Sequence, residues 1–171
     1  MKNTMKHFIC VMFTLMLLLT VCLFAGCKDT ETEGDGSNID SVYETATEFY
    51  ETVTESQTKL DKVADDIYSY WYDAIYNKKY SGNINLAISL AQSSNSTNIE
   101  FIKSNETTIQ SLYKGLRDST YSSEVKDVMS AYSSYYEFVV NVSGSFNSYS
   151  SSKETLKKDL ANALKRLSLE L

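Results

Sequence analysis

IDSVYETATEFYETVTESQTKLDKVADDIYSYWYDAIY, residues 39–76, is the stretch that decides the fold. Apolar residues recur through it at intervals of three and four positions. Because an α-helix has about 3.6 residues per turn, this spacing places them along one face. The stretch therefore predicts one amphipathic helix of about 40 residues, which would be about 60 Å long. A capping box of Ser41 and Glu44, or a cap from Ser37, would begin it.

A second helical pattern occupies residues 83–117, where isoleucines, leucines and alanines keep the same spacing. Its middle, SSNST at 93–97, is polar. Three asparagines fall at positions that face the core: Asn95, Asn98 and Asn105. We expect a continuous helix with a polar layer inside the bundle, because buried asparagines can fix the register of packed helices and the helix then matches the first in length. In the alternative, the helix breaks at 93–97 and restarts with a capping box of Thr97 and Glu100.

Two shorter helices are predicted after Ser122. The first keeps the helical spacing as far as Val142, and SGSFNSYSSS at 143–152 then interrupts the pattern. A capping box of Ser151 and Glu154 predicts the start of a last helix that is rich in leucine.

Glycines mark the ends of the predicted helices. Gly82, Gly115 and Gly144 fall at or near three of these ends, as helix-terminating glycines do. Short connections make neighbouring helices antiparallel. We therefore predict an all-α fold, an elongated antiparallel bundle of four helices, two long and two shorter. The alternative is a three-helix bundle whose last helix bends at Gly144.

The chain opens with MKNTMKHFICVMFTLMLLLTVCLFAGC, in which Lys2 and Lys6 precede an uncharged apolar run at 8–25. A positive flank followed by such a run is typical of a secretion signal. The end of the run, LFAGC at 23–27, resembles the lipobox of bacterial lipoproteins. The resemblance implies cleavage before Cys27, which then carries acyl chains that attach the protein to the membrane.

This resemblance divides the chain into a signal peptide at 1–26, a lipidated cysteine with an acidic leash at 27–38, and a helical domain at 39–171. The leash has no apolar residue after the cysteine, and we expect it to be disordered with a reach of about 18 Å. In the alternative, the signal is not cleaved and serves as an anchor, since about 18 apolar residues approach the length of a membrane span. Either way we expect the domain on the extracytoplasmic face of the cell membrane.

The residues that remain after cleavage exclude several kinds of catalysis. His7, Cys10 and Cys22 leave with the signal, and Cys27 is lipidated. Metal sites of cysteine and histidine, and nucleophiles activated by histidine, are therefore not expected, and we predict neither an enzymatic activity nor a cofactor. The full chain has a net charge of −6, which becomes more negative when the two lysines of the signal are removed. Nucleic acid is therefore not an expected partner.

IYSYWYDAIYNKKY at 67–80 surrounds the only tryptophan of the chain with tyrosines. On a helix, the tryptophan falls in the core stripe, whereas three tyrosines follow a row four residues apart that turns toward solvent. The row either caps the far end of the bundle, beneath the turn at Asn83 or the 143–151 loop, or forms an exposed patch that stacks on a glycan or anchors a protein. Tyr135 and Tyr136 could extend such a patch. The candidate partner-binding residues are Trp71, Tyr72, Tyr76 and Tyr80.

These features predict a bacterial cell-envelope lipoprotein whose extracytoplasmic helical bundle is a non-enzymatic binding or interaction module. Its expected partners are the membrane, through the lipid anchor on Cys27, and a protein or glycan of the envelope. The runner-up is a structural or accessory subunit of an envelope protein assembly that takes no small ligand.

Overall fold

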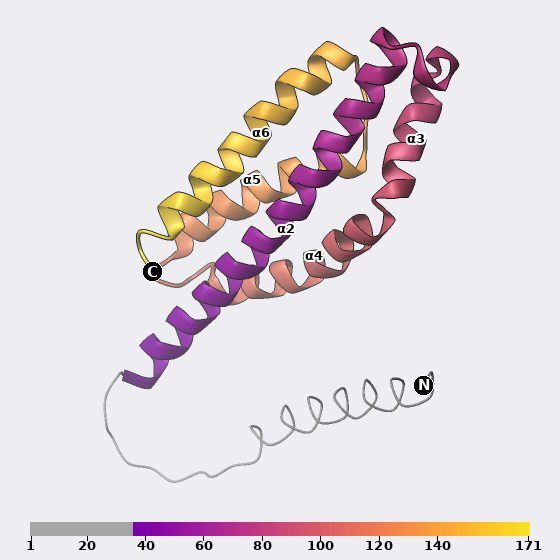
Figure 1. The fold of residues 1–171 in the computed structure, drawn as a ribbon. Coiled ribbons are helices and arrows are strands. Elements are labelled where there is room, and N and C mark those ends of the chain that lie inside the picture. The colour runs from indigo at the N-terminus through magenta and orange to yellow at the C-terminus, as the bar shows by residue number, and fades with distance from the viewer. Residues whose placement is uncertain (1–35) are drawn as a thin grey trace, which may run out of the picture. The chain divides into compact units, whose positions relative to one another are not determined.

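The computed structural model describes residues 36–171. This part of the chain is helical and contains no β-strand, which confirms the prediction of an all-α fold. The predicted signal peptide, Cys27 and the predicted leash up to residue 35 lie outside the described residues. The elements are α2 (Gly36–Tyr76), the short 3-10 helix η1 (Lys79–Gly82), α3 (Ile84–Ser94), α4 (Ser96–Leu116), α5 (Ser122–Val140) and α6 (Phe146–Leu167) (Figure 1).

The long helix α2 is the central element, because it packs against each of α3, α4, α5 and α6. Its buried face follows the predicted spacing and comprises Ala46, Phe49, Val53, Leu60, Val63, Ala64, Ile67, Trp71 and Ala74. The predicted caps are wrong. The helix α2 begins at Gly36, so Ser37, Ser41 and Glu44 lie inside it. No proline in its first turns prevents the helix from starting there.

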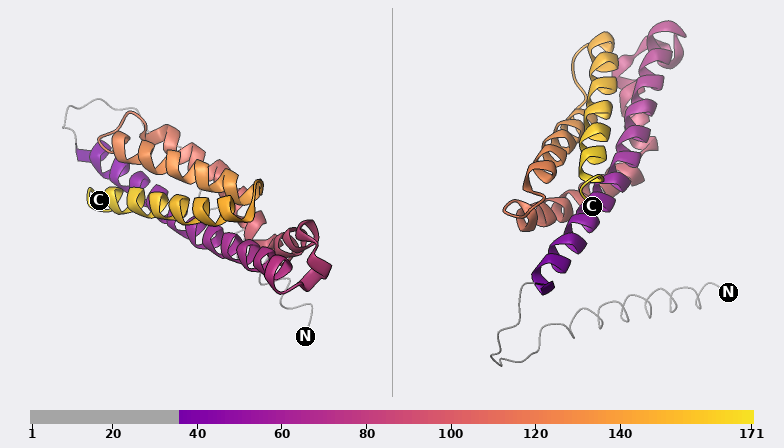
Figure 2. Two further views of the ribbon diagram at one scale, coloured as in Figure 1. Left: turned by 90° about the horizontal axis from the view of Figure 1, so that it is seen from above. Right: turned by 90° about the vertical axis from the view of Figure 1, so that its left-hand side faces the viewer.

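The remaining helices lie on two sides of α2. α5 and α6 pack against each other, and α4 packs against α5, whereas α3 contacts α2 and α4 but neither α5 nor α6. Figure 1 shows α6 along one side of α2 and α3 along the other. Figure 2 shows α5 and α6 side by side from two further directions. At the end where α2 stops, α3 is therefore separate from the α5–α6 pair.

The prediction of one continuous helix over 83–117 is wrong, because the helix is interrupted at Asn95. This residue has φ −107° and ψ 17°, outside the helical region. Its backbone N–H donates to the Gln92 carbonyl at 3.1 Å, and helical bonding resumes when the Ile99 N–H donates to the Asn95 carbonyl at 2.9 Å. Asn95 thus occupies the N-cap position just before α4, in place of the capping box expected at Thr97 if the helix broke.

The Asn95 side chain explains the interruption. It is buried, and its Nδ2 donates to the Ala91 carbonyl at 3.0 Å and to Asp66 Oδ2 at 2.8 Å. Asn98 Nδ2 donates in turn to Asn95 Oδ1 at 3.0 Å. Short polar side chains that bond to the backbone compete with the helical ladder. The two alternatives drawn from the sequence therefore occur together, a break in the helix and a polar layer inside the fold.

The last helix begins at Phe146, earlier than predicted. Ser145 Oγ accepts a bond of 3.2 Å from the Ser148 N–H, and Ser148 Oγ accepts one of 2.9 Å from the Ser145 N–H. This reciprocal capping box satisfies two backbone donors that a helix start leaves without partners. It replaces the predicted box of Ser151 and Glu154, which lie inside α6.

A strained turn joins α2 to α3. Four of its residues have positive φ: Lys78, Tyr80, Ser81 and Gly82. This conformation is unfavourable for residues other than glycine, so other contacts must hold the turn. Asp73 supplies them by accepting bonds from Asn77 Nδ2 at 2.6 Å and Lys79 Nζ at 2.7 Å. The Tyr80 ring stacks on Tyr70 with 5.5 Å between their centroids.

Candidate functional site

Phe146 lies at the centre of an aromatic cluster between α2 and α6. The centroid of its ring is 5.1 Å from that of Tyr68, 6.0 Å from Trp71, 6.1 Å from Tyr72 and 5.9 Å from Tyr76. This residue lies in the stretch that was predicted to interrupt the helices, and it was not among the predicted site residues. Because the serine capping box starts α6 at Phe146, its ring is held against α2. We call these five residues the Phe146 cluster.

Trp71 belongs to the core as well as to this cluster. Its side chain is only 4% exposed, and it packs edge-on against Phe146 and at 5.5 Å from the ring of Tyr149. Its Nε1–H is buried and has no hydrogen-bond partner in the described part of the chain. An indole N–H in such a place usually finds an acceptor, which makes this donor unusual.

Tyr72 and Tyr76 are the exposed members of the cluster. They are 41% and 56% exposed, and their ring centroids lie 4.6 Å apart. Both also contact Phe146. Phe146 belongs to the 143–151 segment, which is one of the places where the tyrosine row was expected to pack. One side of each ring thus packs on the fold while the remainder faces solvent.

Tyr80 does not join Tyr72 and Tyr76, so the predicted row of three is wrong. The row requires a helix that continues to residue 80, whereas α2 ends at Tyr76 and the chain enters the strained turn. Tyr80 stacks on Tyr70 instead. Tyr135 does not extend an exposed patch either, because its side chain is fully buried.

A surface groove with a volume of about 670 Å³ lies beside the Phe146 cluster. It occupies the end of the fold formed by the last turns of α2, the turn before α3 and the connection between α5 and α6, and we call it the distal groove. Its volume falls in the range of small-molecule sites. The lining residues are Trp71, Ile75, Gly82, Asn83, Ile84, Asn85, Ile88, Val142, Ser143, Gly144, Ser145 and Phe146.

The groove lies where α3 packs on α2 but not on the α5–α6 pair. α3 has no contact with α5 or α6, and the interruption at Asn95 separates its direction from that of α4 (Figure 1). The space between α3 and the 141–145 connection is therefore not filled by a helix. Branched and aromatic side chains line it, and its polar groups are the amides and hydroxyls of asparagines and serines.

The outer face of α3 carries further apolar side chains. Ile84, Leu86 and Leu90 are 37%, 45% and 40% exposed. Ile84 also lines the distal groove, so the apolar surface continues from the groove onto the outside of α3. Together with Tyr72 and Tyr76, these residues gather most of the exposed large apolar side chains of the described region at one end of the fold. Exposed apolar side chains that gather in one region of a surface are typical of an interaction site.

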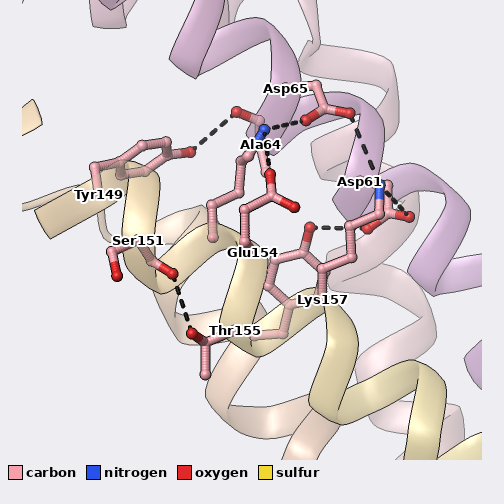
Figure 3. Close-up of polar contacts among 10 residues, drawn as sticks. Asp61, Ala64, Asp65, Tyr149, Ser151, Glu154, Thr155 and Lys157 are labelled. Atoms are coloured by element: carbon pink, nitrogen blue, oxygen red, sulfur yellow. Dashed lines mark hydrogen bonds and ion pairs between the residues drawn. The ribbon is translucent and has the colours of Figure 1, made fainter. Parts of the chain in front are cut away.

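A polar network joins α2 to α6, on the N-terminal side of the Phe146 cluster in α2. Figure 3 shows Asp61 and Asp65 of α2 facing Glu154 and Lys157 of α6. Lys157 Nζ lies 3.1 Å from an oxygen of Asp61, and Lys153 Nζ lies 2.5 Å from Asp65.

Lys153 is mostly buried, and its ammonium also lies 4.7 Å from the centroid of the Tyr68 ring. Burial lowers its pKa, but the hydrogen bonds to Asp65 and Glu154 outweigh this effect and raise the pKa above the ordinary lysine value. A lysine held in its charged form beside carboxylates cannot act as a base. We therefore interpret this network as one that positions α6 on α2.

The buried tyrosines give no evidence of a nucleophile. Burial raises the pKa of Tyr132, Tyr135 and Tyr149, and nearby carboxylates raise each further. Their hydroxyls are therefore harder to ionise than in water. Among residues 36–171, no group of three or more histidine, cysteine or acidic side chains could hold a metal ion. In the same residues, no helix has both the length and the apolar character needed to cross a bilayer.

Comparisons of the chain with protein-family models, with curated proteins and with solved structures gave no match.

Sequence reasoning singled out Trp71, which lines the groove, and Tyr72 and Tyr76, which belong to the Phe146 cluster, but it missed the other residues that line the groove. Phe146 was missed because the surrounding serines and glycine resemble a loop. The signal for it was a pair of serines three residues apart, which can cap each other. The aliphatic wall of α3 was assigned wholly to the core, because a continuous helix over 83–117 leaves no gap beside it.

Proposed function

We propose that this chain is a membrane-tethered lipoprotein of the cell envelope whose extracytoplasmic domain binds a partner through the distal groove and catalyses no reaction. Acyl chains on Cys27 hold it to the membrane. In this proposal the domain is a four-helix bundle in which α3 and α4 together make one kinked arm.

The distal groove is the observation that carries this proposal. It combines an apolar wall with a neutral polar rim. Sites with mostly apolar linings and a few placed polar groups are typical of ligand binding. The groove also lies at the end of α2 opposite Gly36, where the leash joins. A helix of 41 residues separates the two by about 60 Å, so a tether would leave the groove accessible.

Site-specific crosslinking tests the function of the groove. A photoreactive residue placed at Asn85, which is exposed on the groove rim, should form an adduct with one defined component of the envelope in intact cells. The matched control carries the same residue at Thr107, which is exposed on α4 away from the groove. Equal adducts at both positions, or none at Asn85, would contradict the proposal.

The anchor is tested separately. Cys27→Ser removes the thiol that would be acylated, so we expect the protein to accumulate as a larger precursor or to leave the membrane fraction. The control is Cys22→Ser, which lies in the apolar run of the expected signal and should not alter maturation. Normal maturation of Cys27→Ser with unchanged membrane attachment would rule out lipidation there.

The second candidate function is that of an accessory subunit in an envelope assembly. The exposed row of Leu86 and Leu90 on α3 favours it, because helices that pack on a partner present such faces. An obligate subunit should melt at a temperature that depends on protein concentration or on its partner. If the domain is such a subunit, the melting temperature of the double variant Leu86→Ser, Leu90→Ser should no longer depend on protein concentration or on the partner. The crosslink at Asn85 should persist in this variant.

A further inference from the structure

A small apolar face holds helix α3 to the rest of the fold. Of its eleven residues, the buried ones are Ala87 and Ala91, and an alanine side chain buries little apolar surface. By contrast, α4 buries Ile102, Ile109 and Leu116. α3 packs on α2 and touches α4, but it has no contact with α5 or α6 (Figure 1). Elements with few buried apolar contacts are the ones that open locally while the rest of a protein stays folded.

The turn before α3 contains backbone strain that opening would release. Lys78, Tyr80 and Ser81 have φ of 55°, 56° and 55°, a left-handed conformation that side chains with a Cβ disfavour. The turn needs these conformations only while α3 lies against α2, because in a detached turn each residue can return to negative φ. The strain therefore favours the open state.

The interruption at Asn95 separates α3 from α4 at the other end. Asn95 has φ −107° and ψ 17°, and its Nδ2 donates to Asp66 of α2 at 2.8 Å. This bond holds the end of α3 on α2. Helical hydrogen bonding resumes only where the Ile99 N–H donates to the Asn95 carbonyl. Unwinding of α3 therefore need not extend into α4.

We infer that α3 is a flap, in which residues 78–94 open as one unit while α2, α4, α5 and α6 stay folded. A helix of eleven residues is marginal when it stands alone in water, so α3 unwinds when it leaves α2. Closing returns Ile84 and Ile88 to the wall of the distal groove, which is complete only in the closed state. The inference rests on the proposed function where it treats this groove as a binding site, but the opening itself can be measured without a partner.

Native-state hydrogen exchange measures the opening. The experiment uses the full chain in phosphatidylcholine nanodiscs, follows exchange by mass spectrometry of short peptides, and repeats it at several urea concentrations below the unfolding transition. We expect the α3 amides to exchange at least about a hundredfold faster than those of residues 60–67 in central α2, because they open at a lower free energy. They should also share one urea dependence, weaker than that of α2, since this slope scales with the surface exposed.

Two variants should shift the opening in opposite directions. Ser81→Gly relieves a strained φ of the closed state at an exposed residue, so α3 should exchange about threefold more slowly. Asp73→Ala removes the carboxylate that holds the turn, so α3 should exchange about tenfold faster. Its control is Asp127→Ala, which removes an exposed ion pair with Arg166 of α6 and should leave the exchange of α3 unchanged. Exchange in central α2 should be the same in all three variants.

Ser89→Gly is the matched control for Ser81→Gly. It makes the same change at an exposed position inside α3, where glycine weakens the helix, so it should quicken the exchange of α3.

Three results would overturn the inference. The α3 amides could exchange at the rate and with the urea dependence of central α2, which would mean that α3 opens only when the whole domain unfolds. They could exchange at unrelated rates without urea dependence, which would mean that they fray one by one. Ser81→Gly could quicken exchange as Ser89→Gly does, which would mean that strain does not favour the open state. The Asn85 crosslink tests the proposed function separately, because it requires a partner and the exchange experiment does not.

Discussion

The Tyr135 hydroxyl of α5 donates a hydrogen bond of 2.8 Å to Asp61 Oδ1 of α2. The other carboxylate oxygen of Asp61 lies 3.1 Å from Lys157 Nζ of α6. One side chain of the central helix thus links two other helices. Figure 3 shows Asp61 beside Lys157 of α6. Because a displacement of any of the three helices would leave a polar group without its partner, this arrangement favours one register of packing.

Tyr135→Phe tests this link with little change in volume. The ring keeps its buried position, but Asp61 loses a donor. We expect the free energy of unfolding to fall by about 1–2 kcal/mol, as measured by urea denaturation. Tyr113→Phe is the control, because Tyr113 packs only partly buried against the core, and it should change stability by less than about 0.5 kcal/mol. Equal losses in the two variants would show that the Asp61 bond contributes nothing particular.

Alkaline pH should unfold the domain through its buried tyrosines. Burial raises the pKa of Tyr132, Tyr135 and Tyr149, and burial with Glu106 raises the pKa of Tyr136 to about 12. In an unfolded chain a tyrosine ionises near about pH 10. The folded state therefore favours the neutral phenols, a contribution that is complete below about pH 10 and is lost as the pH rises further.

We accordingly expect the free energy of unfolding to decrease between about pH 10 and about pH 12. The absorbance of these tyrosinates should appear together with the loss of the helical circular dichroism signal. Tyr136→Phe removes one of the four groups, so stability should fall less steeply with pH in that variant. An unchanged slope would contradict the raised pKa of Tyr136.

The sequence predicted the helical class and the long central helix because these depend on a pattern repeated over many turns. One residue that departs from the spacing between Ala46 and Ala74 does not obscure the helical pattern, and the buried face of α2 follows this spacing. The start of α5 at Ser122 was also predicted. The separation of α3 from the α5–α6 pair was not predicted, because it depends on which helix pairs make contact.

The errors arose where one or two polar residues decide the local structure. Asn95 was given two exclusive roles, a polar layer or a break, yet its side chain bonds to Ala91 and Asp66 and produces both. The serines around Phe146 were interpreted as loop because serine is weak in helix interiors, although serine is favoured where a helix begins. Both errors concern residues that shape the distal groove.

Asn95→Ala should therefore affect the groove as well as stability. The change removes the bonds to Asp66 and Ala91 and the competition with the helical ladder, so residues 84–116 can approach a continuous helix. We expect a loss of about 1–2 kcal/mol in the free energy of unfolding and a changed environment for Trp71, whose groove has α3 as one wall. Indole fluorescence and urea denaturation measure the two effects.

The control for this variant is Thr97→Ala, which changes an exposed residue two positions further along. It should alter stability by less than about 0.5 kcal/mol and leave the fluorescence as it is. If Asn95→Ala loses stability while Trp71 keeps its spectrum, the interruption stabilises the fold but does not shape the groove.

Phe146→Ala should expose Trp71, because Phe146 packs directly against the indole and lines the same groove. In the unaltered protein Trp71 is 4% exposed, so we expect blue-shifted emission and weak quenching by acrylamide. The variant should emit further to the red, be quenched more readily and lose about 2–3 kcal/mol of stability, less than a fully buried phenylalanine. Tyr76→Ser is the control, since Tyr76 contacts Phe146 and is 56% exposed; its Trp71 spectrum should remain blue-shifted. Red-shifted emission already present in the unaltered protein would mean that Phe146 does not cover the indole.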